Sequence, residues 1–150
     1  MGSYTSTNKN GKSDEGLTES ENEKIVKELF EAYNRRDIDF IINHFADDLI
    51  FVQPSGETIG KDELPQAYSM LFDVFQDGKW SIPRVISKGN VVAVEILVEG
   101  THTGEFLGIP ATGKKIDVHA VWFIDFNEEG KIERVIDYWN ERRFIAQVSE

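Results

Sequence analysis

The stretch from Val91 to Phe126 constrains the fold of this chain more than any other part of the sequence. Its two ends, VVAVEILVEGTHTG and IDVHAVWFIDF, are rich in β-branched and aromatic residues and have the length of long strands. The loop EFLGIPATGKK joins them, and KIERVIDYWNE predicts a third strand one turn later. Side by side, three such strands make a curved sheet that is long enough to form the wall of a small-molecule pocket.

The residues before this stretch predict three helices. The first begins near Thr18, where a capping box pairs Thr18 with Glu21. The same motif fits Ser20 with Glu23. One apolar stripe follows, as expected of an amphipathic helix. The stripe consists of Ile25, Val26, Leu29, Phe30 and Tyr33.

Two further helices and two further strands precede the central stretch. Asp37 is expected to cap a short helix, DFIINHF, which the acidic pair 47–48 ends. A short strand then runs over residues 49–53, and a third helix follows Gly60. A strand over residues 80–86 leads into a hairpin turn. Helices followed by consecutive antiparallel strands predict an α+β fold with the helices on one face of a bent sheet. The buried face of the third helix is expected to be Leu64, Tyr68, Leu71, Phe72 and Phe75.

The composition excludes several kinds of partner. A net charge of −11 argues against nucleic acid and anionic membranes, because both need basic patches. The chain has no cysteine, which excludes disulfides, thiolate metal sites and a cysteine nucleophile. No apolar run approaches the roughly 18 residues of a membrane span, and no hydrophobic signal segment is present. We therefore expect a cytoplasmic protein.

Motifs for metals and cofactors are missing from the sequence. Its three histidines are scattered without the spacing of a ligand pair, and it has neither a P-loop nor G-x-G-x-x-G. It also lacks the G-x-S-x-G elbow of a serine nucleophile. We expect no metal and no cofactor. Residues 1–17 are polar and are expected to form a flexible tail, and residues 18–150 a single domain.

Alternation within the Val91 strand predicts which of its residues face the interior. Glu95 and Glu99 fall on the odd positions, so the even face is expected to be buried. His102 shares that face if the strand stays regular past Gly100, and it would then be a substrate-binding group in the pocket or at its rim. A bulge at Gly100 would instead leave His102 as a structural hydrogen-bonding residue. The even positions are Val92, Val94, Ile96 and Val98.

The last hairpin turns at NEEG, and a type I turn there would pair Asn127 with Lys131. Counting back from this pair predicts that Trp122, Tyr138 and Asn140 line the interior. A slip of one residue would reverse the two faces.

On that register, Asp137 and His119 lie on the outer face of the sheet, on neighbouring strands. The other residues expected there are apolar, and an apolar outer sheet face usually covers a partner. We therefore expect a homodimer packed sheet to sheet. The apolar residues of this face would be Val121, Phe123, Val135 and Trp139.

Three segments resemble a known superfamily. ELFEAYNRRDIDFIINHFADDLIFVQPSG resembles the opening of the nuclear-transport-factor-2-like superfamily. EGTHTGEFLGIPATGKKI and EEGKIERVIDYWN resemble its SnoaL-like polyketide cyclase branch, and the resemblance covers residues 21–148. It implies a cystatin-like α+β cone, in which a curved antiparallel sheet wraps around three N-terminal helices and a deep pocket opens at one end. Members of the superfamily are commonly dimers.

The ketosteroid isomerase branch of this superfamily has a general-base aspartate where this chain has Gln53. An amide cannot abstract a proton, so Gln53 is expected to hold a polar group of a substrate. That branch also has an oxyanion-binding tyrosine on the first helix, and the equivalent residue here is Leu29. Both differences argue against enolisation by that route.

The polyketide cyclases carry an acid/base aspartate near the end of the last strand. The alignment of GKIERVIDYWN puts Asn140 at that position, and an offset of three residues puts Asp137 there instead. Asp137 and His119 are the only acid/base pair on adjacent strands, so they form either a catalytic dyad or an outer-face pair at a dimer interface. Trp122 is expected to be an apolar wall of the pocket, and Tyr33 and Tyr68 core residues.

These observations favour a pocket protein for a small apolar or polycyclic molecule. Its reaction would need no cofactor and would be an aldol cyclisation, an isomerisation or a hydrolysis by proton transfer. Asp137 would be the acid/base, and Gln53, Tyr138 and Asn140 would orient the substrate. The alternative is a non-catalytic ligand-binding or dimerisation module with a degenerate site. A third possibility is that a protein partner binds to the outer face of the sheet. An Asp137 side chain inside the cavity would favour the enzyme.

Overall fold

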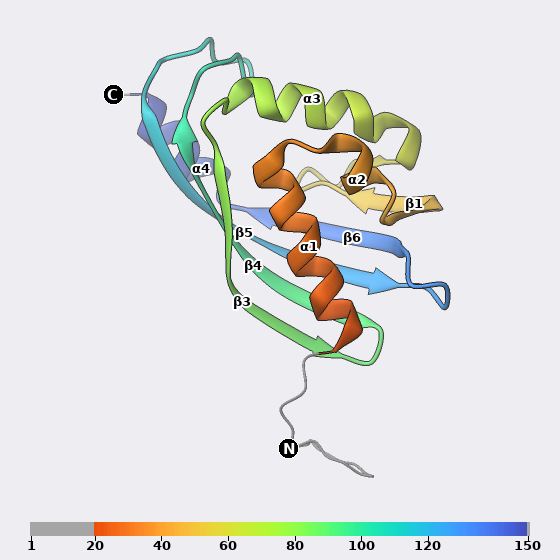
Figure 1. Cartoon of the computed structure of the whole chain (residues 1–150). Helices are drawn as coiled ribbons and strands as arrows, with labels where there is room; N and C mark the ends of the chain where they lie inside the picture. The colour runs from red at the N-terminus through yellow and green to blue at the C-terminus, as the bar shows by residue number, and fades with distance from the viewer. Residues whose placement is uncertain (1–19, 150) are drawn as a thin grey trace.

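The computed structural model describes residues 20–149. Six strands form one strongly curved sheet in the order β2-β1-β6-β5-β4-β3. Three helices, α1 to α3, pack across the concave face of this sheet, and a C-terminal helix, α4, lies near one end of it (Figure 1). The expected α+β architecture is confirmed, although the sheet does not close into a barrel. The expected tail, residues 1–17, and the Thr18 cap lie outside the described residues.

Helix α1 spans Glu21–Arg35 and is capped by Ser20, whose hydroxyl accepts a hydrogen bond from the Glu23 backbone N–H at 3.0 Å. Of the two caps expected from the sequence, the structure therefore shows the one at Ser20. The apolar stripe faces the sheet, as its helical spacing requires. Its buried members are Val26, Leu29, Phe30, Ala32 and Tyr33, and Ile25 is only partly buried.

Helix α2, Ile38–Ile42, begins at Asp37, whose carboxylate accepts from the Phe40 backbone N–H at 3.2 Å. Strand β1 then runs over Phe45–Val52, so the acidic pair 47–48 lies within a strand instead of ending a helix. This expectation was wrong because Phe45 pairs with β6 far along the chain, and that contact overrides the local preference for a helix.

Of the remaining elements, the third helix and the four long strands follow the expected order, whereas β2 and the C-terminal helix α4 were not predicted. Strand β2 covers Thr58–Ile59, a short 3-10 helix η1 covers Lys61–Glu63, and helix α3 covers Leu64–Val74. Four long strands and a last helix complete the chain: β3 Lys79–Lys88, β4 Val91–Thr101, β5 Lys115–Phe126, β6 Ile132–Trp139 and α4 Glu141–Val148.

Strands β3 to β6 pair antiparallel in sequence order, as expected, but β1 runs parallel to β6. The sheet is therefore mixed and not purely antiparallel. A parallel pair needs a long crossover between its strands, and here everything from β2 to β5 lies between β1 and β6.

Strand β4 has the faces that its alternation predicts. Val92, Val94 and Ile96 are buried, and Val98 is partly buried. The pairing of β4 with β5 runs without interruption through Gly100 to Thr101, so no bulge forms at Gly100.

The hairpin between β5 and β6 corrects the predicted register. The Asn127 backbone N–H donates to the Lys131 carbonyl at 2.8 Å, as the turn predicts. The pairing then shifts at Glu133, the extra residue of a β-bulge, since Phe126 pairs with Ile132 and Asp125 pairs with Arg134. Every later residue of β6 faces the side opposite to the one expected.

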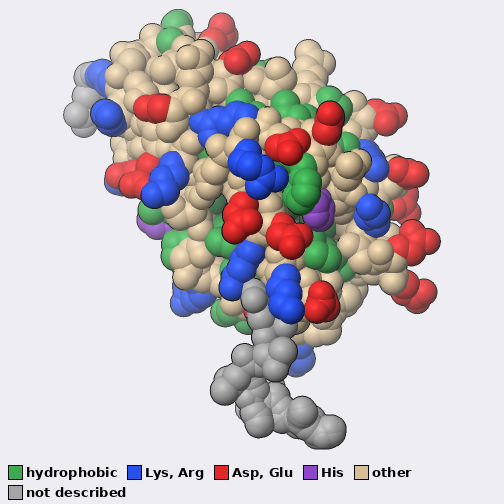
Figure 2. Space-filling view, viewed as in Figure 1, with side chains coloured by type: hydrophobic (Ala, Val, Ile, Leu, Met, Phe, Trp, Pro, Cys, Tyr) green, Lys and Arg blue, Asp and Glu red, His purple; other side chains and the backbone are tan. Residues whose placement is uncertain are grey.

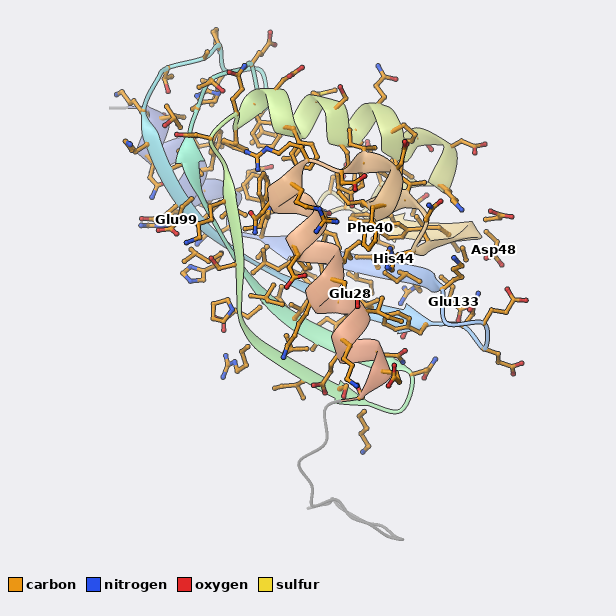
Figure 3. All side chains as sticks on the ribbon, in the orientation of Figure 1. Glu28, Phe40, His44, Asp48, Glu99 and Glu133 are labelled. Carbon is orange, nitrogen blue, oxygen red and sulfur yellow. The ribbon has the colours of Figure 1, made fainter. Side chains whose placement is uncertain are left out.

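The bulge has a physical cause in the packing of β6. Ile132 and Val135 are both fully buried, yet three positions separate them, and a regular strand would put them on opposite faces. The extra residue at Glu133 lets both side chains reach the core. Figure 3 shows Glu133 with Asp48 at the edge of the molecule where β1 and β6 lie. Val135, expected on the outer face, is in fact a core residue.

On the face shown in Figure 2, acidic side chains occur at several places among basic ones, and several of them lie along one edge. Among residues 20–149, no helix is both long enough and apolar enough to cross a membrane.

Candidate functional site

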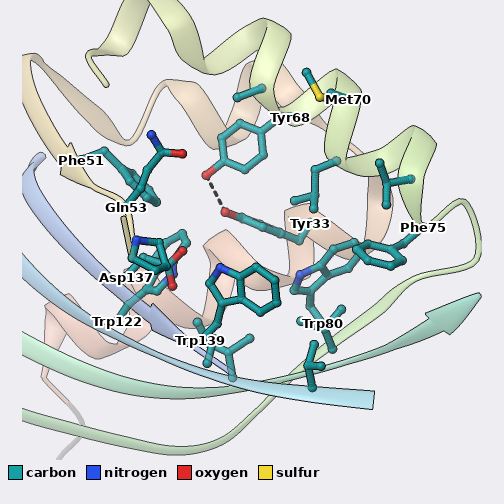
Figure 4. Close-up of a pocket in the computed structure, with 18 of the residues that line it drawn as sticks. Tyr33, Phe51, Gln53, Tyr68, Met70, Phe75, Trp80, Trp122, Asp137 and Trp139 are labelled. Carbon is teal, nitrogen blue, oxygen red and sulfur yellow. Dashed lines mark hydrogen bonds between the residues drawn. The ribbon is translucent and has the colours of Figure 1, made fainter. Parts of the chain in front are cut away.

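A cavity of about 360 Å³ lies between the helices and the concave face of the sheet (Figure 4). Its volume falls in the range of small-molecule sites, which are mostly apolar with a few placed polar groups. Four of its lining residues carry a hydroxyl, amide or carboxyl group: Tyr33, Gln53, Tyr68 and Asp137. The aromatic walls come from α1, α3 and the sheet and include Phe30, Phe51, Phe75, Trp80, Trp122 and Trp139.

Asp137 is the acidic residue that lines this cavity. On β6 it lies directly opposite Trp122 of β5, because the bulge at Glu133 has shifted the register by one residue. Its Oδ1 atom is buried and has no hydrogen-bond partner among the described residues. Burial raises the pKa of Asp137 to about 7, and a side-chain hydrogen bond with Trp122 partly opposes that rise. A carboxyl group with such a pKa can both accept and release a proton near neutral pH.

Tyr33 of α1 and Tyr68 of α3 meet at the cavity wall. Their hydroxyl oxygens lie 2.5 Å apart, and both side chains are buried. Burial is the main cause that raises the pKa of each hydroxyl well above its ordinary value. Both therefore stay protonated across the physiological range. Sequence reasoning correctly expected core residues here but missed that their hydroxyls reach the cavity.

Gln53 follows β1 and lines the cavity with Phe51, as the shared face of these two residues predicts. Its backbone N–H donates to the Glu57 carbonyl at 2.8 Å, which holds the turn after β1. The amide side chain makes no hydrogen bond to another described residue. It is therefore free to bind a polar group of a ligand.

Two of the residues expected to line the pocket lie elsewhere. Tyr138 is 56% exposed on the outer face of the sheet, beside Phe123, and not in the interior. Asn140 caps α4, where its side-chain oxygen accepts from the Arg143 backbone N–H at 3.1 Å. The bulge reverses the face of Tyr138, and the start of α4 takes Asn140 away from the sheet.

The expected dyad of Asp137 and His119 does not form. His119 is exposed on the outer face and pairs with Leu97 of β4, whereas Asp137 faces the cavity. Side chains on opposite faces of a sheet cannot share a proton. Trp139, expected on the outer face, lines the cavity with Asp137.

His102 is fully buried but does not line the cavity. Its Nδ1 atom lies 2.9 Å from the Thr112 hydroxyl, and its ring packs edge-on against Phe144 at 5.2 Å. Its Nε2 atom has no partner among the described residues. These contacts tie the loop after β4 to α4, so His102 has a structural role and does not line the pocket, and it has this role without a bulge at Gly100.

The described part of the chain contains no group of three or more His, Cys, Asp or Glu residues that could hold a metal ion. Sequence reasoning missed three residues that line the cavity. Trp139 was missed because the predicted pairing of β5 with β6 placed it on the outer face of the sheet. Tyr33 and Tyr68 had one detectable signal: each adds a hydroxyl to an apolar helical stripe, and a buried hydroxyl needs a partner.

A curved, unclosed sheet packed around helices and a largely apolar cavity define a protein of the α+β cone class with a small-molecule pocket. The model of the SnoaL-like polyketide cyclases matches residues 23–148, and this chain belongs to that family. The expected nuclear-transport-factor-2-like fold and SnoaL-like branch are confirmed. No curated protein matches the sequence significantly.

Several solved structures superpose on most of the chain. AclR of Streptomyces galilaeus, provisionally a hydroxylase, has a TM-score of 0.78 at 25% identity, over 86% of this chain and 96% of AclR. A provisional SnoaL-like polyketide cyclase from Jannaschia sp. CCS1 has a TM-score of 0.80 at 20% identity, over 89% and 98%. IdmH of Streptomyces antibioticus, provisionally a polyketide cyclase, has a TM-score of 0.77 at 19% identity, over 87% and 100%.

Proposed function

We propose that this chain is a cofactor-independent enzyme that moves a proton on a small apolar or polycyclic molecule, with Asp137 as the acid/base. One observation carries the proposal: a carboxyl group with an unpartnered oxygen and a pKa of about 7 lines an otherwise apolar cavity. A structural carboxylate would be expected to have its hydrogen bonds satisfied, because burial without partners is costly. Groups with pKa values shifted toward the working pH are typical of active sites.

The reaction classes that fit are those that begin with removal of a proton from carbon next to a carbonyl group. Intramolecular aldol cyclisation and isomerisation both begin in this way, and the first is in keeping with the polyketide cyclase name of IdmH. Hydrolysis is less well supported, since the cavity lining contains neither a serine nor a histidine. Gln53 and Trp122 would orient the bound molecule. A cytoplasmic location, expected from the sequence, is part of this proposal.

The test is hydrogen–deuterium exchange at the acidic carbon of 2-tetralone, a small bicyclic ketone, followed by NMR in heavy water. The wild-type chain is expected to accelerate exchange, and Asp137→Asn to reduce that acceleration by about 10²–10⁴-fold, which is the usual value of general acid–base help. Asp125→Asn is the matched control, because Asp125 faces the outer side of a neighbouring strand and pairs with Arg134. Binding of 2-tetralone without exchange would instead support the non-catalytic binding module.

We further propose that the outer sheet face pairs with the same face of a second copy. Its centre carries Val121, Phe123 and Tyr138, all exposed. The ion pairs Arg84–Glu95 and Arg134–Asp125 balance the charge on the surrounding strands. Two copies can therefore meet there without strong repulsion, in spite of the net charge of −11 on each.

A further inference from the structure

The hydroxyl groups of Tyr33 and Tyr68 carry one proton that does not take part in the hydrogen bond between them. Two hydroxyl groups carry two protons, and the contact between their oxygens at 2.5 Å uses one of them. Neither hydroxyl makes another hydrogen bond within residues 20–149. One O–H donor at the wall of the cavity therefore remains available to a third oxygen atom.

Aromatic rings enclose Tyr33 more closely than Tyr68, so the Tyr68 hydroxyl is the better placed of the two to reach a ligand. Tyr33 is enclosed by aromatic rings on several sides, with centroid distances of 4.8 Å to Phe30, 5.6 Å to Trp80 and 6.2 Å to Trp122. Either hydroxyl can donate to the other, and an arrangement in which Tyr33 donates and the Tyr68 oxygen accepts leaves the free proton on Tyr68.

This donor lies within electrostatic reach of Asp137. The charge of Asp137 contributes to raising the pKa of both tyrosines, so the three groups share one poorly screened region. Figure 4 shows the two hydroxyls, the Gln53 amide and the Asp137 carboxyl directed into the same part of the cavity. A base and a hydrogen-bond donor at one cavity wall are the two groups that enolisation requires.

We propose that Tyr68, oriented by Tyr33, donates a hydrogen bond to the carbonyl oxygen of an enolisable ketone whose neighbouring C–H bond faces Asp137. This inference rests on the proposed role of Asp137 and adds a second catalytic residue. The Asp137 carboxylate takes the proton from carbon, and the C–H electron pair forms the enolate. The resulting charge on oxygen is stabilised by the Tyr68 O–H, which keeps its proton. Asp137 then returns the proton to carbon. In the aldol branch the enolate instead attacks a second carbonyl carbon, and the oxygen of that carbonyl takes the proton from Asp137, which restores the carboxylate.

Tyr33 is the positioning residue in this arrangement. It holds the Tyr68 oxygen as an acceptor, which directs the Tyr68 proton into the cavity and makes it a stronger donor, since hydrogen bonds in a chain polarise one another. Loss of the Tyr33 hydroxyl is therefore expected to weaken the donor without removing it.

The experiment combines the 2-tetralone exchange assay with binding of 2-naphthol, a stable mimic of a planar enol. Tyr68→Phe is expected to slow exchange by about 10²–10³-fold, as is typical when one oxyanion donor is removed. Tyr33→Phe is expected to slow it by less than Tyr68→Phe does, because the donor is weakened but not removed. Tyr138→Phe is the matched control, because this tyrosine lies on the outer face of the sheet. It is expected to exchange at the wild-type rate.

Binding of naphthols of graded acidity separates a donor from a merely structural tyrosine. If Tyr68 donates, affinity rises with the basicity of the bound oxygen in wild type, and the slope of this dependence falls in Tyr68→Phe and Tyr33→Phe. An unchanged slope, or a wild-type exchange rate in Tyr68→Phe, would overturn the proposal for Tyr68 while leaving Asp137 as the base. Unchanged exchange in Asp137→Asn would instead remove the proposed function itself. If Tyr68→Phe loses its cooperative thermal transition, the Tyr33→Phe slope decides between the two.

Discussion

Trp122 and Asp137 face one another across β5 and β6, and this pairing forms the polar end of the cavity. It exists because β6 contains one extra residue at Glu133. Without the shift, Trp122 would face Ile136, and the cavity lining would lose its carboxyl group. The indole of Trp122 also stabilises the ionised carboxylate through a hydrogen bond, which limits the rise in its pKa.

The raised pKa of Asp137 predicts how stability depends on pH. The folded chain holds this proton up to a pH of about 7, whereas the unfolded carboxyl releases it at its ordinary, lower pKa. The contribution of this carboxyl group to the free energy of unfolding is therefore fully present below its pKa in the unfolded chain. It is lost as the pH rises through its pKa in the folded chain. Asp137→Asn is expected to raise the free energy of unfolding at about pH 8 by roughly 2–4 kcal/mol and to change it little at about pH 4.

Urea denaturation of wild type and Asp137→Asn at both pH values checks this prediction. Asp125→Asn, whose carboxylate lies on the outer face, is expected to show no such pH-dependent gain. An equal effect of Asp137→Asn at the two pH values would mean that the carboxyl is not desolvated in the folded state.

The rate of exchange of 2-tetralone should follow the same ionisation. Only the carboxylate can accept a proton from carbon, so the rate is expected to rise with pH and to level off above a pKa of about 7. The measurement is the NMR exchange rate across this range. A profile that falls with increasing pH would show that the protonated carboxyl, and not the carboxylate, limits the reaction.

Deleting Glu133 should leave Asp137 in the cavity. The shorter strand would run without the bulge and still pair Arg134 with Asp125, so all later residues keep their faces. Deleting Ile136 is expected to turn Asp137 outward. If Asp137 instead kept its face, the residues before the deletion would change faces, and this would bury the charged side chain of Arg134. Carbon-13 NMR titration of the Asp137 carboxyl checks this: its raised pKa should persist in the first variant and return to an ordinary value in the second.

Phe123→Glu should prevent association through the outer sheet face. The phenyl ring is 45% exposed and lies 6.4 Å from the ring of Tyr138. A charge buried at an apolar interface without a partner is costly, so we expect the variant to sediment as a monomer where wild type sediments as a dimer. Leu107→Glu, an exposed apolar position in the loop before β5, is the control. A wild-type sedimentation coefficient for Phe123→Glu would place the dimer contact elsewhere.

The local features of this fold followed from the sequence alone. The caps at Ser20 and Asp37 and the buried face of β4 depend on residues within a few positions of one another. The pairing of Asn127 with Lys131 is equally local. Sequence periodicity and turn chemistry encode such features directly, because the interacting groups are close along the chain.

The site depended on contacts between distant segments. The face of Asp137 was decided by the need to bury both Ile132 and Val135, and the start of β1 by its pairing with β6. The hydroxyl pair of Tyr33 and Tyr68 joins two residues on different helices that lie 35 positions apart in the sequence. Side chains along a strand alternate between the two faces of the sheet, so one bulge moves every later side chain to the opposite face. The sequence of β6 alone did not predict this bulge. The sequence thus determined the elements and the family resemblance, and tertiary packing decided which side chains face the cavity.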